Sequence, residues 1–273
     1  MSAAFSFNRI VAIGLWVVGG GTALFLIAPI LAIIPLSFNA EPFFTYPMPG
    51  LSLRWYNEFF SSEVWKLALR NSIIVAVFAT LLSTVLGTLA AIGLSQSDCP
   101  ARATLTAILI SPMIVPVVVA AVGIYYAFAA VGLLNSLTGL VLAHTVLGAP
   151  FVVVTVTAAL SGFDQNLMRA AASLGAGPVE AVLRVMLPLI APGVASGALF
   201  AFVTSFDEVV VALFIAGSEE RTLPRQMWSG VRETLSPTIA AVAALLIVFS
   251  TLFLATIQWL QGRAELQKTH REE

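Results

Sequence analysis

Two adjacent carboxylic acids, Asp207 and Glu208, interrupt an apolar segment that otherwise runs from residue 185 to residue 218. A carboxylate within a membrane-spanning helix is unfavourable, by roughly 2.5–3.5 kcal/mol at the helix centre. Such groups are therefore expected to have a use. One use is to line a translocation path and attract a cationic solute. The alternatives are a structural pair, with its basic partner on another chain, and a side chain that reaches the outer membrane interface.

Aromatic side chains around these carboxylates favour the binding of ammonium groups. On a continuous helix, Phe200 and Phe214 lie seven residues before and after Asp207, and so share its face. Glu208 shares its face with small and polar residues instead, which suit contact with a neighbouring helix. Because aromatic rings attract ammonium groups, we expect Asp207, more than Glu208, to select a cationic cargo.

Tyr125 and Tyr126 lie near the expected outer end of another apolar segment and are candidates for the same lining. Tyrosines at that depth also form the interfacial belt of membrane proteins. His144 lies within an apolar segment and is expected to pack between helices. The chain has one cysteine and two histidines, which excludes an internal disulfide and a multi-cysteine metal site.

Catalytic chemistry is poorly supported. An integral-membrane enzyme would have to use Asp207, Glu208 and His144, but their spacing matches no catalytic motif. We therefore predict no catalytic residue and no metal-binding residue in this chain.

The composition is that of a membrane protein. Of the 273 residues, 59% are hydrophobic and only 10% are charged, against about 25% charged in soluble domains. So little charge cannot cover a water-facing surface of this size. The net charge of -1 gives no basic patch, so nucleic acid is not an expected partner. The expected fold class is all-α, a polytopic protein embedded in lipid.

Charge-free segments long enough to cross a bilayer divide the chain into six expected transmembrane helices within one domain, residues 1–273. A turn-like stretch at residues 132–136 splits the longest segment in two. The first helix is longer than the apolar part of a signal peptide and is expected to be a retained anchor. The six helices are expected at about 12–38, 70–95, 104–131, 137–160, 188–215 and 238–261.

The segment at about 162–187, between the fourth and fifth helices, predicts two short helices separated by a glycine. Asp164 is an expected N-cap, Gly175 an expected C-terminal stop, and Pro178 opens the second helix. Each helix carries an apolar stripe but is too short to be stable alone. The stripes must therefore pack either on a partner protein or back on their own bundle.

The same segment carries a spaced motif: Arg169, Ala170, Ala171, Gly175, Leu187 and Pro188. It resembles the Glu-Ala-Ala loop of the permease subunits of ABC importers. The resemblance implies the type I importer permease fold and a cytoplasmic coupling helix that docks on an ATPase subunit. It also implies that both termini are cytoplasmic. Arg169 stands where the family has Glu, so a charge-reversed contact with the ATPase is expected.

Further segments resemble the second permease subunit of spermidine/putrescine-type importers: Ser205-Phe206-Asp207-Glu208, Thr222-Leu223-Pro224, Leu235-Ser236-Pro237 and Ser52-Leu53-Arg54-Trp55-Tyr56. This implies a polyamine cargo, the bacterial inner membrane, and transport by alternating access. The implied partners are a second, similar permease, two copies of an ATP-binding subunit and a periplasmic solute-binding protein. The chain has no phosphate-binding loop motif, so we expect it to hold no cofactor, with ATP and magnesium bound by the ATPase.

Two alternative transport functions remain. The chain could serve an ABC importer for another small solute, such as an amino-acid derivative, an opine or a phosphonate. It could also be a secondary transporter that uses Asp207 or Glu208 as a proton site. Secondary transporters often contain internal repeats, and this sequence has no convincing one.

Overall fold

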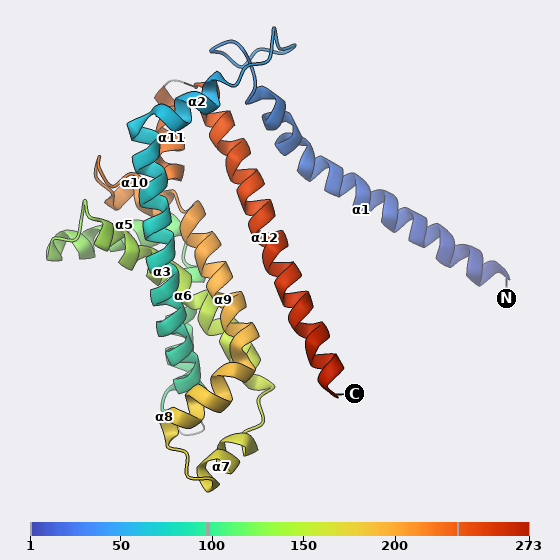
Figure 1. The fold of residues 1–273 in the computed structure, drawn as a ribbon, viewed down its shortest axis with the longest axis vertical. Coiled ribbons are helices and arrows are strands. Elements are labelled where there is room, and N and C mark those ends of the chain that lie inside the picture. Colours follow the sequence, from blue (N-terminus) through green and yellow to red (C-terminus); the bar gives the residue numbers. More distant parts are fainter. Residues whose placement is uncertain (1, 97–98, 234, 273) are drawn as a thin grey trace. The chain divides into compact units, whose positions relative to one another are not determined.

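The computed structural model describes residues 2–96, 99–233 and 235–272; Met1, Ser97, Asp98, Thr234 and Glu273 lie outside the described residues. The chain forms two compact units, one of residues 63–229 and one of residues 1–62 with 230–273. Within the described residues, every regular element is a helix (Figure 1). The expected all-α fold class is therefore confirmed.

The larger unit, residues 63–229, is built around three packed helices, α3 (Glu63–Ser95), α6 (Leu137–Ser161) and α9 (Leu187–Asp207). Glycines allow α9 to approach α6 closely. A Cβ atom added at Gly197 would lie 2.8 Å from the Val152 Cα, and one added at Gly193 would lie 2.6 Å from the Ala159 Cβ. In a membrane, small residues at contacts allow the backbone packing that holds helices together.

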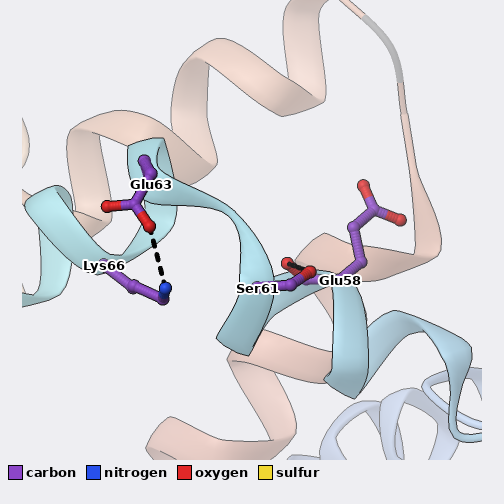
Figure 2. A network of polar contacts seen from close by, with 4 residues as sticks. All are labelled: Glu58, Ser61, Glu63 and Lys66. Carbon is purple, nitrogen blue, oxygen red and sulfur yellow. Dashed lines mark hydrogen bonds and ion pairs between the residues drawn. The ribbon is translucent and has the colours of Figure 1, made fainter.

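Helix α3 begins seven residues before the expected start at residue 70. Its first turn contains two charged residues, and the Lys66 ammonium pairs there with the Glu63 carboxylate at 2.9 Å (Figure 2). At the end of α2 (Arg54–Ser61), in the smaller unit, Ser61 Oγ donates to the Glu58 carbonyl. Hydropathy alone therefore underestimates the length of α3.

The expected helix at 104–131 is divided into α4 (Arg102–Ile114) and α5 (Val117–Val131), which meet at an angle of 108°. Pro116 causes the division, since proline lacks an N–H and forces the preceding residue into an extended conformation. Val115 has that conformation, with ψ 132°. The turn after α5 contains Gly132 at φ +71°, and Ser136 then caps α6 by accepting from the Gly139 N–H.

The expected helix at 188–215 begins earlier, at Pro178, and is broken between Asp207 and Val210. The helical course runs without interruption through α8 (Pro178–Ala181), the π-helical turn η1 (Val182–Met186) and α9. The π turn lies just before Pro188, whose ring and missing N–H are incompatible with a regular α-helix there. Helical geometry stops at Glu208, with ψ 117°, and resumes in α10 (Val210–Ile215).

The remaining long helices are α1 (Ser2–Leu36) and α12 (Pro237–Glu272). By length and composition, 4 helices of the described chain can each cross a membrane, and the bent α4–α5 pair makes a fifth candidate. The apolar part of α12 is shorter, Pro237–Leu252. This arrangement is compatible with six spans.

Candidate functional site

The segment between α6 and α9 ends its first helix at a glycine. Two hydrogen bonds end helix α7 (Asn166–Ser173). The Ala176 N–H donates to the Ala171 carbonyl and the Gly175 N–H donates to the Ala172 carbonyl, both at 3.0 Å. This is the hydrogen-bond pattern of a Schellman C-cap, in which the residue after the C-cap is left-handed. Gly175 is that residue, with φ +88°. The first helix ends as predicted.

The first short helix starts slightly differently from expectation, and the second starts at Pro178 as expected. The Asp164 carboxylate accepts from the Asn166 N–H at 2.9 Å, but the capping position itself is held by Gln165. Gly177 is the N-cap of α8 and Pro178 follows it in the first turn. Across α8 and the π turn, Arg184 pairs with Glu180 at 2.9 Å.

Some apolar residues of this segment are buried within the chain and others are exposed. The small side chains of Ala171 and Ala181 are buried, whereas Leu174 is 90% exposed and Val179 is 72% exposed. The alanines therefore pack within the chain, and the two large side chains that flank Gly175 face outward. In Figure 1, α7 and α8 lie at the end of the larger unit opposite to α10.

Arg169 lies on the exposed surface of α7 and donates weakly to the Asn166 amide oxygen, at 3.3 Å. It borders a pocket of about 430 Å³ together with the end of α3. Ala170 and Pro188 are exposed and Leu187 is half-buried. The motif residues thus occupy one continuous segment from α7 to the start of α9.

At the other end of α9, the two carboxylates have different environments. Glu208 Oε1 accepts from the Val211 N–H at 2.9 Å and so caps α10. Asp207 is the last residue of α9, is exposed, and makes no ion pair with any described residue. Both predicted helical faces are wrong beyond residue 207, because the chain is not helical at Glu208.

The aromatic residues predicted around Asp207 are only partly brought together. Phe200 remains seven residues before Asp207 on α9, and its ring stacks on Phe151 with centroids 6.1 Å apart. Phe214 lies on α10, beyond the break, and is 40% exposed. The break therefore removes Phe214 from the helical face of Asp207.

Tyr125 and Tyr126 contact each other edge to face, with ring centroids 5.6 Å apart. Their helix, α5, packs on α10 through the buried Ala121 and Val211. This places the helix beside the segment that follows the break rather than beside the Asp207 turn itself.

His144 has a more specific contact than the predicted packing role. The ring is fully buried, and Nδ1 lies 3.1 Å from the Ser205 carbonyl oxygen and 2.9 Å from Ser205 Oγ. Ser205 belongs to the last turn of α9. A histidine in an apolar span indicates a polar contact inside the protein, but the sequence does not indicate which helix the histidine contacts.

Sequence reasoning missed a set of polar contacts that hold the loop after α10. Asn71 Nδ2 donates to the Glu219 and Arg221 carbonyls, and Ser72 Oγ accepts from the Leu223 N–H. From helix α11 (Leu223–Glu233), Arg225 donates to the Ala216 carbonyl at 2.7 Å and also to that of Gly217. Burial, together with the nearby Arg221, lowers the pKa of Arg225. Two adjacent polar residues, Asn71 and Ser72, in an apolar span could have indicated that this part of α3 binds polar groups of another segment.

The described residues do not meet the requirements of a metal site. Among the residues that the structure describes, no three His, Cys, Asp or Glu side chains are grouped so that they could hold a metal ion.

The helical fold and the long apolar helices define a polytopic membrane protein. Residues 83–265 match the family described as "Binding-protein-dependent transport system inner membrane component", and the chain belongs to that family. It is a multi-pass protein of the inner membrane and a transport subunit, not an enzyme.

Individual relatives extend the match to most of the chain. The chain is 34% identical, over 83% of its length and 88% of the relative, to the spermidine/putrescine transport system permease protein PotC of Haemophilus influenzae. It is 31% identical, over 89% of each, to the putrescine transport system permease protein PotI of Escherichia coli.

A solved structure has the same fold. A chain of a bacterial ABC transporter that imports the acidic polysaccharide alginate superposes with a TM-score of 0.70 at 17% sequence identity. The superposition covers 92% of this chain and 96% of that one.

Proposed function

We propose that this chain, residues 1–273, is one transmembrane permease domain of an ABC importer that moves a polyamine such as spermidine or putrescine. In this proposal the segment 162–187 is a cytoplasmic coupling loop, and both termini are cytoplasmic. A second permease, two ATPase subunits and a periplasmic binding protein complete the transporter. ATP and magnesium belong to the ATPase subunits.

The observation that carries this proposal is the unbroken helical course from Pro178 to Asp207, 30 residues long. At 1.5 Å per residue, such a helix measures ~45 Å. One end lies in the exposed coupling loop and the other at the break beside Asp207. A helix of this kind transmits a displacement of the loop to the carboxylate, which is what a transporter driven by an external ATPase requires.

The exposed surface of the coupling loop supports docking of a partner. Leu174 and Val179 flank the Gly175 turn and face outward, although large apolar side chains in contact with water are unfavourable. The alternative, in which the whole loop packs back on its own bundle, accounts for Ala171 and Ala181 only. We infer that the ATPase covers Leu174 and Val179, with Arg169 facing a polar or acidic part of its surface.

The cationic cargo is supported by Asp207 and by the relatives. The carboxylate is exposed and unpaired within the described chain, at the C-terminal end of α9, where the helix dipole is negative. A cation is attracted to such a position. The relatives PotC and PotI are both named for polyamine transport, whereas the alginate importer shares only the fold, which does not specify a cargo.

Asp207→Asn tests the cargo, because it keeps the shape and removes the charge. Charged hydrogen bonds contribute about 1.5–3 kcal/mol, so ATP-driven uptake of labelled putrescine at low concentration should fall about tenfold or more. The measurement uses the complete transporter in reconstituted vesicles, and basal ATPase activity should be retained.

Glu208→Gln is the matched control. It also removes one negative charge, but an amide oxygen can still accept from the Val211 N–H and cap α10. Uptake should stay within about twofold of the parent protein. Normal amine uptake by Asp207→Asn would contradict the proposed role of this carboxylate in binding the cargo.

A further inference from the structure

The break between α9 and α10 leaves backbone groups that need partners. The last four carbonyls of a helix have no N–H group of the same helix to accept from, and the Ser205 carbonyl is one of these. In a continuous helix it would pair with the N–H of residue 209, but helical geometry ends at Glu208. Within a membrane such a group must find a partner inside the protein.

His144 supplies that partner from a different helix. A carbonyl oxygen can only accept, so we assign the hydrogen to Nδ1, the tautomer in which the 3.1 Å contact is a hydrogen bond. Ser205 Oγ, 2.9 Å from the same nitrogen, can share it. Both residues are buried, with His144 0% exposed and Ser205 5% exposed, so the contact is shielded from water.

His144 is the side chain that the described structure places on the Ser205 carbonyl. The buried hydroxyls of Ser83 and Thr145 nearby are engaged elsewhere, since Ser83 Oγ donates to the Thr145 carbonyl and Thr145 Oγ1 to the Val141 carbonyl. The other ring nitrogen, Nε2, is buried and has no hydrogen-bond partner among the described residues. The imidazole therefore has one polar function in this structure, which is to hold the end of α9.

We propose that His144 is a positioning residue for transport. Its Nδ1–H holds the last turn of α9 against α6 and thereby sets the direction in which Asp207, two residues further on, presents its carboxylate. Glu208 holds the other side of the break through its cap on α10. This inference depends on the proposed function of Asp207 as the cargo carboxylate.

A series of substitutions separates this role from simple packing. His144→Phe keeps a ring and loses the donor. His144→Asn places an amide N–H close to the position of Nδ1, whereas His144→Gln extends it towards the position of Nε2. A packing residue should tolerate Phe better than Asn, and a positioning residue should tolerate Asn better than Phe and Gln.

The first readout is transport by the complete reconstituted transporter. For His144→Phe and His144→Gln we expect the KM for putrescine to rise about tenfold, which is the effect of losing a buried hydrogen bond of about 1.4 kcal/mol. The maximal rate should change less than the KM. His144→Asn should stay within about threefold of the parent. Thr145→Val is the control, since its hydroxyl bonds only within α6, to Val141.

The second readout does not depend on cargo. Cys99 is the only cysteine, so Cys99→Ala allows a single cysteine to be placed by Asp207→Cys. The rate at which a positively charged, water-soluble thiol reagent labels position 207 reports how that side chain is presented. We expect His144→Phe to change this rate at least fivefold and His144→Asn to leave it unchanged, in protein that purifies as an intact complex.

Two results would overturn the inference. One is parental labelling and KM in His144→Phe, and the other is an equal defect in His144→Asn and His144→Phe. Failure of the proposed function is distinguishable, because it would appear as no ATP-driven putrescine uptake by the parent transporter, and failure of the role of Asp207 would appear as normal uptake by Asp207→Asn. In either case the labelling series would still show whether His144 positions the α9 terminus.

Discussion

The carboxylates of Asp207 and Glu208 are adjacent in sequence, but the backbone gives them different tasks. Asp207 ends α9, and Glu208 is the first residue outside it. Glu208 uses its carboxylate to accept from the Val211 N–H, so it is part of the fold. Asp207 makes no ion pair with any described residue and is exposed. A single change of backbone conformation thus separates a structural acid from one that is free to meet a cation.

Gly175 has a backbone conformation that makes the coupling loop sensitive to its substitution. An added Cβ would meet nothing within 4 Å, so space is not limiting, but the backbone has φ +88°. An L-residue in a left-handed conformation is unfavourable by roughly 1–2 kcal/mol, and Asn tolerates it best. We expect Gly175→Val to reduce substrate-stimulated ATPase activity and uptake severalfold, with Gly175→Asn closer to the parent.

Gly177 provides the control for this series. A Cβ added there would also meet nothing within 4 Å, but the φ of Gly177 is −69°, which any residue adopts. Gly177→Ala should couple ATP hydrolysis to transport normally. Full coupling in a well-expressed Gly175→Val protein would show that the turn geometry is not needed for transmission.

At the scale of elements, apolar composition predicted where the chain is embedded but not where its helices break. A window of apolar residues scores the same whether the helix is continuous or bent, which is why the 104–131 segment was expected to be one helix. Pro116 marks the position of the break, but a proline alone does not predict one. Pro29 in α1 and Pro150 in α6, for example, lie inside continuous helices. Tertiary contacts decide between these outcomes.

The turn at Gly175 was more predictable than the environment of Asp207, for a physical reason. The end of α7 depends on one local conformation, and glycine is the residue that adopts it. The environment of Asp207 depends instead on a break in α9 and on His144, which is 63 residues away in sequence. A periodic pattern cannot report a contact between helices that are distant in the chain.

Close packing of α9 on α6 gives a test at this scale. A Cβ at Gly197 would lie 2.8 Å from the Val152 backbone, so Gly197→Val should force the helices apart. Overpacking of this kind destabilises by about 1–3 kcal/mol. We expect earlier thermal unfolding in detergent and weaker transport. Gly93→Ala, on α3, is the control, since nothing lies within 4 Å of its added Cβ.

At the scale of the molecule, the larger unit carries both ends of the proposed mechanism. The coupling loop lies at one end of α3, α6 and α9, and α10 lies at the other (Figure 1). The loop that follows α10 is held by Asn71 and Ser72 of α3 and by Arg225 of α11. These contacts fix the far side of the break, so a movement of α9 would be taken up at Glu208 and Val209.

The energy source distinguishes the proposed ABC importer from a proton-coupled secondary transporter that uses the same carboxylates. In an ABC importer the energy enters through the coupling loop from a partner ATPase. A secondary transporter would need no such loop and no nucleotide.

The most direct test is uptake of labelled putrescine by vesicles that contain the complete transporter, with ATP supplied only on the ATPase side. For an ABC importer of polyamines we expect saturable uptake that requires ATP and the periplasmic binding protein and is unaffected when the proton gradient is dissipated. Uptake that continues without ATP and stops when the proton gradient is dissipated would contradict it.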